Sequence, residues 1–125
     1  MSDTDQASLV KVFSQADFDN FARLSGDDNP IHTDPKFCAS SRFGRTVAHG
    51  LLLCSVLRGL IEQLVPAGRL SEMAVMFPAP TYAGEPMQFS VSVTGNSDDE
   101  IELQLEVKRE GDGVVTCQGQ ARAEL

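Results

Sequence analysis

Apolar and polar residues along this chain follow two different periods. Up to about residue 65, the apolar residues recur mainly at the 3.6-residue spacing of a helix. From about residue 70 they alternate with polar residues, which is the pattern of a strand with one buried face. The chain is therefore expected to fold as helices followed by a run of strands.

Two helices stand out in the first half. Ser14, with Asp17 three residues later, is typical of a capped helix start, and this helix is expected to end near Gly26. The strongest helical pattern covers residues 50–65. Apolar side chains surround most of its first two turns, and the residues that interrupt them cluster on one side: Ser55, Arg58, Gly59, Glu62 and Gln63. A helix of this kind is normally buried, so these residues are predicted to lie at the centre of the fold.

The segment between these helices has little periodicity. Residues 27–34 are not predicted to be helical, and Asn29-Pro30 favours extended or turn geometry. Asp34-Pro35 has the character of an N-cap followed by proline at the first helical position, so a short helix is expected to run to about Ser40.

The strands are predicted from strict alternation, with turn residues between the last three at 95–99 and 110–113. In chain order they cover residues 9–13, 70–77, 87–94, 101–108 and 115–125. Helices followed by a strand meander indicate an α+β fold with the helix on one face of an antiparallel sheet. We expect that sheet to curl around the helix at residues 50–65.

The overall composition limits the possible partners. A chain of 125 residues suits one domain, expected to span residues 1–125. Lys and Arg total 10 against 18 Asp and Glu, a net charge of −8. A nucleic-acid partner is not expected, because the phosphate backbone requires a basic surface. The most apolar stretch, residues 51–57, is too short to span a bilayer, so a membrane partner is not expected either.

The cysteines and the N-terminus favour a cytoplasmic location. The three cysteines are odd in number and form no CxxC pair, which argues against a disulfide framework. Residues 1–6 contain two acids and no basic or apolar run, unlike a secretory signal peptide. The cysteines are Cys38, Cys54 and Cys117.

The candidate chemistry lies between residues 27 and 50, a stretch that contains both histidines of the chain. Asp27 precedes His32 by five residues, and a carboxylate beside an imidazole can act as a general acid–base pair near neutral pH. His49-Gly50 opens the long predicted helix, whose first amides have no internal acceptor and can bind a developing oxyanion.

Simpler interpretations of these residues stay open at this level. Asp27 and His32 also suit turn chemistry or a surface pair. Spacing alone could suggest metal ligands in His32-Thr33-Asp34, but with two histidines and no thiolate pair we predict no metal site. Residues 35–61 contain four basic residues and no acid, a patch that suits either a compact anionic ligand or simple solvation. The basic residues are Lys36, Arg42, Arg45 and Arg58.

Several spaced elements of residues 21–53 together resemble the signature of the MaoC-like, (R)-specific enoyl-CoA hydratases, which have a hotdog fold. The matching elements are Gly26-Asp27, Asn29-Pro30-Ile31-His32, Asp34-Pro35, Phe43-Gly44 and His49-Gly50. The resemblance implies a hotdog fold, with the antiparallel sheet wrapped around one long buried helix. It also implies hydration of a trans-2-enoyl-CoA or the reverse dehydration.

The resemblance assigns roles to individual residues. Asp27 and His32 match the catalytic pair that holds a water, and Gly50 matches the glycine whose amide polarises the thioester carbonyl. Asn29 would shape the loop at the substrate site. The family needs no metal or redox cofactor, because coenzyme A is part of the acyl-CoA substrate, and its domains usually pair as homodimers.

One position departs from the family pattern. Better-known members have a serine eight residues after the glycine, where this chain has Arg58, and Ser55 lies one turn earlier. Both are substrate-binding candidates. Arg58 could favour an acyl group bearing a carboxylate, or could pair with Glu62 on the outside of the helix.

Two other functions stay open from the sequence. One is a hotdog acyl-CoA thioesterase, in which a carboxylate activates water on the thioester carbonyl. The other is an acyl-thioester binding protein without catalytic activity. An enoyl-CoA assay separates them, because hydration removes the conjugated enoyl group, hydrolysis releases a thiol, and a binding protein does neither.

Overall fold

The strands form a single antiparallel sheet in the order β1-β3-β4-β5-β2, in a computed structural model that describes residues 5–125. The N-terminal segment examined for a signal peptide lies largely outside these residues. In chain order the elements are β1 (Gln6–Val12), α1 (Gln15–Ser25), α2 (Pro30–Thr33), α3 (Pro35–Ala39), α4 (Gly50–Leu64), β2 (Arg69–Met76), β3 (Pro86–Asn96), β4 (Glu100–Arg109) and β5 (Val115–Glu124).

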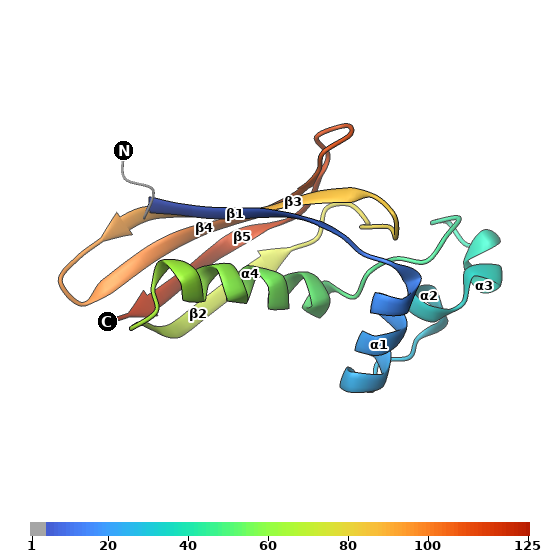
Figure 1. The fold of residues 1–125 in the computed structure, drawn as a ribbon, viewed down its shortest axis with the longest axis horizontal. Coiled ribbons are helices and arrows are strands. Elements are labelled where there is room, and N and C mark those ends of the chain that lie inside the picture. The colour runs from blue at the N-terminus through green and yellow to red at the C-terminus, as the bar shows by residue number, and fades with distance from the viewer. Residues whose placement is uncertain (1–4) are drawn as a thin grey trace.

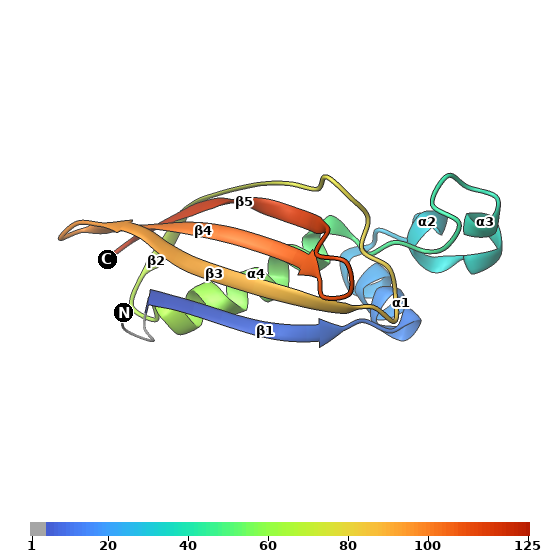
Figure 2. The same ribbon diagram turned by 90° about the horizontal axis from the view of Figure 1, so that it is seen from above.

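The long helix α4 runs along one face of the sheet, and the three short helices gather beyond its N-terminal end (Figure 1). The view from above shows the sheet curving over α4, with the start of β1 and the C-terminus at the end away from α1–α3 (Figure 2). The predicted α+β architecture is therefore confirmed. The N-terminus of α4, where the candidate residues lie, sits at the junction between the sheet layer and the short helices.

The core lies between α4 and the inner face of the sheet. Four residues of α4 are buried, at the spacing of one helical stripe. They pack against alternate residues of β3 and β4, which are the inward positions of the predicted alternation. The buried side chains are Leu53, Leu57, Leu60 and Ile61 on α4, with Met87, Phe89, Val91, Leu103, Leu105 and Val107 on the sheet.

α4 is buried along one stripe, and the side that carries its non-apolar residues stays accessible, as does part of its apolar surface. Leu51 is 70% exposed, and Ser55 and Gly59 are also exposed. One sheet can cover only one side of a helix, so the remaining apolar residues of α4 stay partly accessible. Among residues 5–125, none of the helices combines the length and apolarity needed to cross a membrane.

The local signals at the helix ends gave mostly correct boundaries. The Ser14 hydroxyl accepts a hydrogen bond from the Asp17 amide, the Asp17 carboxylate accepts one from the Ser14 amide, and α1 ends at Gly26 with φ of 82°. Asp34 caps α3 as predicted. The one-turn helix α2 was not predicted. Its capping residue Asn29 is not helical, and the four helical residues begin only at Pro30.

Candidate active site

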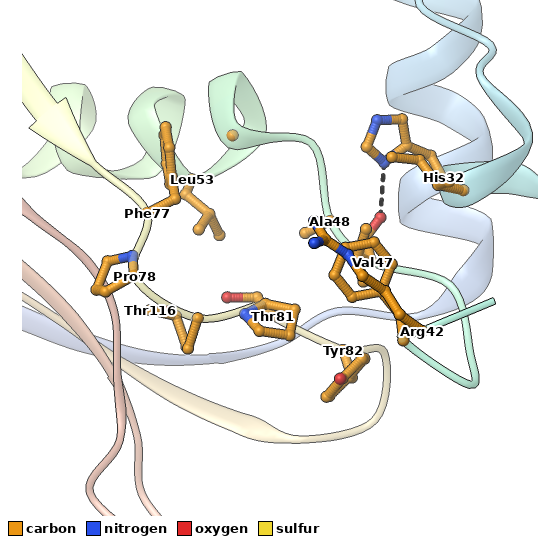
Figure 3. A pocket seen from close by; sticks show the side chains of 15 residues that line it. His32, Arg42, Val47, Ala48, Leu53, Phe77, Pro78, Thr81, Tyr82 and Thr116 are labelled. Carbon is orange, nitrogen blue, oxygen red and sulfur yellow. Dashed lines mark hydrogen bonds between the residues drawn. The ribbon is translucent and has the colours of Figure 1, made fainter. Parts of the chain in front are cut away.

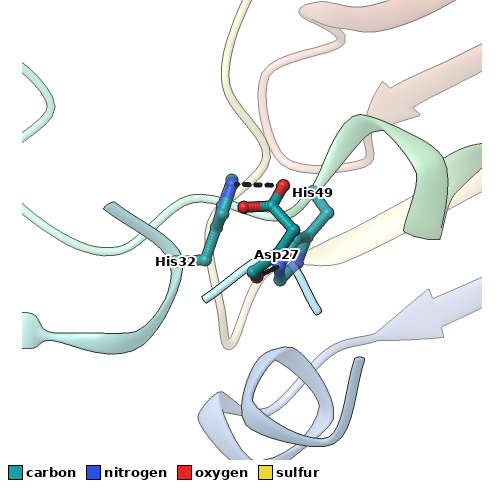
Figure 4. A group of neighbouring side chains, drawn as sticks. All are labelled: Asp27, His32 and His49. Atoms are coloured by element: carbon teal, nitrogen blue, oxygen red, sulfur yellow. Dashed lines mark hydrogen bonds and ion pairs between the residues drawn. The ribbon is translucent and has the colours of Figure 1, made fainter. Parts of the chain in front are cut away.

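Asp27, His32 and His49 converge beside the N-terminus of α4 (Figure 4). Asp27 follows α1, His32 lies on α2, and His49 is the residue that precedes α4. The distance from Asp27 Oδ2 to His32 Nε2 is 3.8 Å. This is longer than a direct hydrogen bond, so both atoms remain available to a small molecule between them. The sequence prediction that Asp27 and His32 form a pair agrees with this geometry.

The orientation of His32 is set by the backbone. Its Nδ1 lies 2.8 Å from the carbonyl oxygen of Val47, which can only accept, so Nδ1 carries the proton and donates it. In the neutral ring Nε2 then presents a lone pair toward Asp27. His32 is 8% exposed, whereas the side chain of Asp27 is 58% exposed. The pair thus joins a fixed imidazole to a carboxylate that is open to solvent.

His49 contacts both members of this pair, although no role for its side chain was predicted from the sequence. Its Nε2 donates a hydrogen bond of 2.8 Å to the backbone carbonyl of Asp27. Its ring stacks on His32 with 3.8 Å between centroids, and the Phe21 ring lies 4.9 Å from the His49 centroid. His49 is 2% exposed, and its Nδ1 has no hydrogen-bond partner among the residues described. His49 is therefore a buried side chain that holds the His32 ring and the Asp27 backbone in position.

Gly50 is the first residue of α4, and its amide has no acceptor in the part of the chain that the structure describes. No side chain caps this helix, so its first amides stay available to a ligand oxygen. A Cβ atom at Gly50 would lie 2.7 Å from Cζ of Phe77. A side chain at this position would require the Phe77 ring, which packs on the Gly50 backbone, to shift.

Two cavities meet at Gly50 and Phe77, both of which line each of them. The larger one, about 680 Å³ and called the His32 cavity below, is shown in Figure 3. The second, about 340 Å³ and called the Asp27 cavity, is also lined by His49. The catalytic candidates therefore lie on the wall between two spaces, with His32 facing one and Asp27 the other.

A thiol lies in the Asp27 cavity. Cys54 lines it from α4, and burial raises the pKa of this thiol above its ordinary value of 9.0. The thiol stays protonated near neutral pH and acts as an apolar wall rather than a nucleophile.

Three other sequence candidates lie outside both cavities. Asn29 is exposed, and its side-chain oxygen accepts from the Ile31 amide, so it shapes the loop by capping α2. The exposed Ser55 hydroxyl donates to the carbonyl of Leu52. Arg58 forms an ion pair of 3.2 Å with Glu62, with 41% of its side chain exposed. Neither Ser55 nor Arg58 lines these cavities, so their contact with substrate stays a prediction, while the alternative pairing of Arg58 with Glu62 is present.

The same cluster has the composition of a metal site. Asp27, His32 and His49 each offer one ligand atom, and these atoms all lie within 4.8 Å of one another. Histidines that bind metals commonly donate their other ring N–H to a carbonyl, as both do here. The sequence did not predict this grouping, because His49 lies 17 residues from His32.

Comparisons with known proteins agree with the motif. A sequence model of the MaoC like domain matches residues 3–115. The (R)-specific enoyl-CoA hydratase of Aeromonas caviae is 38% identical over 97 residues, which are 75% of this chain and 72% of that enzyme. The enzyme of the same description from Rhodospirillum rubrum is 32% identical over 91 residues, covering 71% of this chain and 63% of the relative.

The fold comparison gives the same result. A solved structure of the A. caviae (R)-hydratase superposes with a TM-score of 0.89 and 33% identity, covering 96% of this chain and 93% of that one. The R-hydratase structure from Pseudomonas aeruginosa superposes with a TM-score of 0.87 at 22% identity, which shows the shared fold.

Proposed function

The chain belongs to the MaoC-like domain family, and on that premise we propose that it is a hydro-lyase acting on acyl-CoA thioesters. It adds water to a trans-2-enoyl-CoA to give the (R)-3-hydroxyacyl-CoA, or catalyses the reverse dehydration. The observation that carries this proposal is the 3.8 Å approach of the Asp27 carboxylate to His32 Nε2, beside the open amide of Gly50. Together these groups can supply the acid–base chemistry and the oxyanion donor that hydration uses.

The geometry suits a water molecule bound by Asp27 and His32. Because His32 Nδ1 donates to Val47, the Nε2 atom and the Asp27 carboxylate can both accept hydrogen bonds. A water that donates to both would direct an oxygen lone pair at the C3 atom of the enoyl group. Its position is fixed before the reaction, which lowers the entropic part of the barrier.

The proton balance gives the pair two linked tasks. The water oxygen forms a bond to C3, and one of the two groups accepts the proton that the water loses. That proton is then delivered to C2, directly or by way of the other group, so the carboxylate and His32 Nε2 end the reaction unprotonated, as they began. Since both groups lie on the same side of the bound water, hydroxyl and hydrogen add to one face of the double bond.

Gly50 stabilises the charge that develops on the substrate. As C3 is attacked, negative charge accumulates on the thioester oxygen, because the intermediate has enolate character. The amide at the start of α4 can donate to this oxygen, and the helix dipole adds to the stabilisation. The interaction strengthens as the charge grows, so it favours the transition state over the substrate.

The test is an assay of the purified chain with crotonyl-CoA. We expect the conjugated enoyl absorbance to disappear without release of thiol. Release of free thiol would instead identify a thioesterase, and no change in either signal would contradict an enzyme of this class. The proposed reaction moves only a proton and water, so it needs no redox cofactor or metal, and we expect the same rate in the presence of a chelator.

We also propose that the chain forms a homodimer. β1 and β2 are the edges of the sheet, and exposed edges normally need cover. Large apolar side chains are exposed at the end of β2 and at the start of α4: Met76 (58%), Phe77 (47%) and Leu51 (70%). Light scattering should give the mass of a dimer at micromolar protein, and a stable, active monomer would exclude it.

The unpaired state of the three cysteines is consistent with a reducing compartment. All three are unpaired and two of them, Cys38 and Cys117, are buried. Buried free thiols persist where disulfides do not form, so we propose a cytoplasmic location.

A further inference from the structure

The wall of the His32 cavity carries a positive charge without a counter-charge. Arg42 lines this cavity, and Figure 3 shows its side chain extending into the space toward Ala48. None of the lining residues is Asp or Glu. Within residues 5–125 no carboxylate forms an ion pair with Arg42, and its guanidinium lies 4.7 Å from the centroid of the Phe43 ring. In a chain of net charge −8, this cavity is a local site for an anion.

Neighbouring arginines are neutralised, which sets Arg42 apart. Arg45 forms an ion pair of 3.3 Å with Glu85 and lies over the ring of Tyr82. Arg109 approaches the same carboxylate at 3.8 Å. The N–H groups of Arg42 are free of such partners, and a guanidinium can bind a phosphate or carboxylate through two parallel hydrogen bonds.

Two hydroxyl groups of the same cavity also lack partners. Thr81 and Thr116 are 3% and 0% exposed, and neither hydroxyl oxygen has a hydrogen-bond partner in the described part of the chain. Figure 3 shows the Thr81 hydroxyl directed into the cavity. A buried hydroxyl without a partner costs stability, so these groups suit a ligand that brings amides or carbonyls.

The Asp27 cavity has the opposite character. Apart from Asp27, His49 and Ser25 its walls are apolar, and it contains no Arg or Lys. The apolar side chains are Phe21, Leu51, Cys54, Val75 and Phe77. Because the cavities meet at Gly50, a thioester carbonyl held there can direct its alkyl chain into the apolar space and its carrier arm into the His32 cavity.

We propose that the His32 cavity binds the phosphopantetheine arm of the thioester carrier, with Arg42 binding the phosphate of that arm and Thr81 one of its amides. This inference rests on the proposed function and adds which end of the substrate each cavity receives. Coenzyme A and acyl carrier protein share this arm, so the recognised group is the phosphopantetheine itself.

The experiment compares three crotonyl thioesters that differ only in the carrier: coenzyme A, 4′-phosphopantetheine and pantetheine, the last without phosphate. Arg42→Gln should raise KM about tenfold for the first two and leave kcat and the pantetheine KM unchanged, as expected for one lost charge-assisted interaction. Thr81→Val should raise KM for all three, because all carry the amides. The control is Arg69→Gln, which removes an equal charge from an exposed pair with Glu124 at the far end of the sheet.

The outcomes separate this inference from the proposed function. Calorimetry with 4′-phosphopantetheine alone measures binding without turnover, and we expect Arg42→Gln to weaken it about tenfold even if the chain hydrates nothing. If Arg42→Gln weakened the binding of pantetheine as much as that of 4′-phosphopantetheine, the inference would be overturned. A loss of affinity for coenzyme A alone would also overturn it, because Arg42 would then contact the nucleotide. A variant that loses affinity only for a carboxylated enoyl-pantetheine would assign Arg42 to the acyl end and also overturn it.

Discussion

The imidazole rings of His32 and His49 stack with 3.8 Å between centroids and 23° between planes. His49 also donates to the backbone carbonyl of Asp27. One buried side chain thus contacts the ring of one catalytic candidate and the backbone of the other. The separation between Asp27 and His32 depends on where His49 lies, so His49 acts on the reaction through position.

Two substitutions separate the contacts of His49. His49→Phe keeps an aromatic ring against His32 but loses the N–H donor to Asp27, whereas His49→Gln keeps a donor and loses the stack. We expect each to lower kcat about 10–100-fold with little change in KM, because small misplacements of a catalytic group cost this much. A variant that folds normally and keeps the wild-type kcat would contradict the role. The matched control is Phe21→Leu, which changes the other neighbour of the His49 ring and should affect kcat less.

The sequence predicted those features of the site that depend on neighbours in the chain. Asp27 and His32 are separated by one turn of backbone, so their pairing follows from the motif. The bond from His49 to Asp27 spans 22 residues, and the contact of Phe77 with Gly50 spans 27. The first depends on where the loop after α1 lies relative to the start of α4, and the second on where the residue after β2 lies relative to it. Nothing in the local sequence encodes either placement.

The substrate-binding roles of Ser55 and Arg58 stay predictions, because neither residue lines a cavity within one chain. The residues that interrupt the apolar pattern of α4 lie on one side, and none of them is buried, so the sequence did indicate which side of α4 the sheet leaves uncovered. The strands were predicted more accurately, because each has a strict period of two and one inward face. β1 begins at Gln6 rather than at residue 9, since pairing with β3 extends the strand beyond its apolar pattern.

Asp27→Asn and His32→Ala are each expected to lower the hydration rate about 10²–10⁴-fold, the usual effect of losing an acid–base group. Their effects should be strongly non-additive, because both groups serve one water. Asp28→Asn is the matched control, since it removes the adjacent exposed carboxylate. Near-wild-type turnover of either catalytic variant would exclude the assignment.

The same two variants should differ in stability. The Asp27 side chain is largely exposed, so Asp27→Asn should unfold like the wild type. His32 is buried and hydrogen-bonded to the Val47 carbonyl, so His32→Ala should lose about 1–3 kcal/mol of unfolding free energy. The sequence, which placed His32 on a loop, predicted no such loss. Urea denaturation of both variants measures the difference.

Two glycines of α4 offer a matched test of the packing at the site. A Cβ at Gly50 would collide with Phe77, while one at Gly59 would meet nothing within 4 Å. Gly50→Ala should therefore lower stability by about 1–3 kcal/mol and reduce kcat, because Phe77 or the helix start must shift. Gly59→Ala should raise stability by about 0.5–1 kcal/mol. Thermal unfolding distinguishes the two glycine variants. Adding Phe77→Ala should remove the loss of stability caused by Gly50→Ala. Equal effects of the two glycine substitutions on stability would contradict the contact between Gly50 and Phe77.

Cys117 should make stability fall at alkaline pH. Burial, together with the nearby Cys54, raises the pKa of the Cys117 thiol from 9.0 to about 12. The stabilisation is complete below pH 9.0 and is lost as the pH rises toward 12, because only the unfolded chain then releases the proton. Denaturation at increasing pH should show this fall in the free energy of unfolding, and Cys117→Ala should reduce it.

Native Cys117 should also resist thiol reagents at neutral pH until the chain unfolds. Rapid labelling of the folded protein would contradict its burial.

Arg58→Ser tests whether the acyl pocket recognises a carboxylate through α4. A guanidinium in a closed apolar tunnel would need a substrate anion as its partner, so its loss would selectively impair a carboxylated enoyl-CoA. Here Arg58 pairs with Glu62 on an exposed surface, and such pairs contribute less than about 1 kcal/mol. We therefore expect the ratio of kcat/KM values for carboxylated and plain enoyl-CoA substrates to be the same in the variant and the wild type. A selective loss with the carboxylated substrate would show that Arg58 reaches a binding site formed only in the assembled enzyme, because within one chain it lines neither cavity.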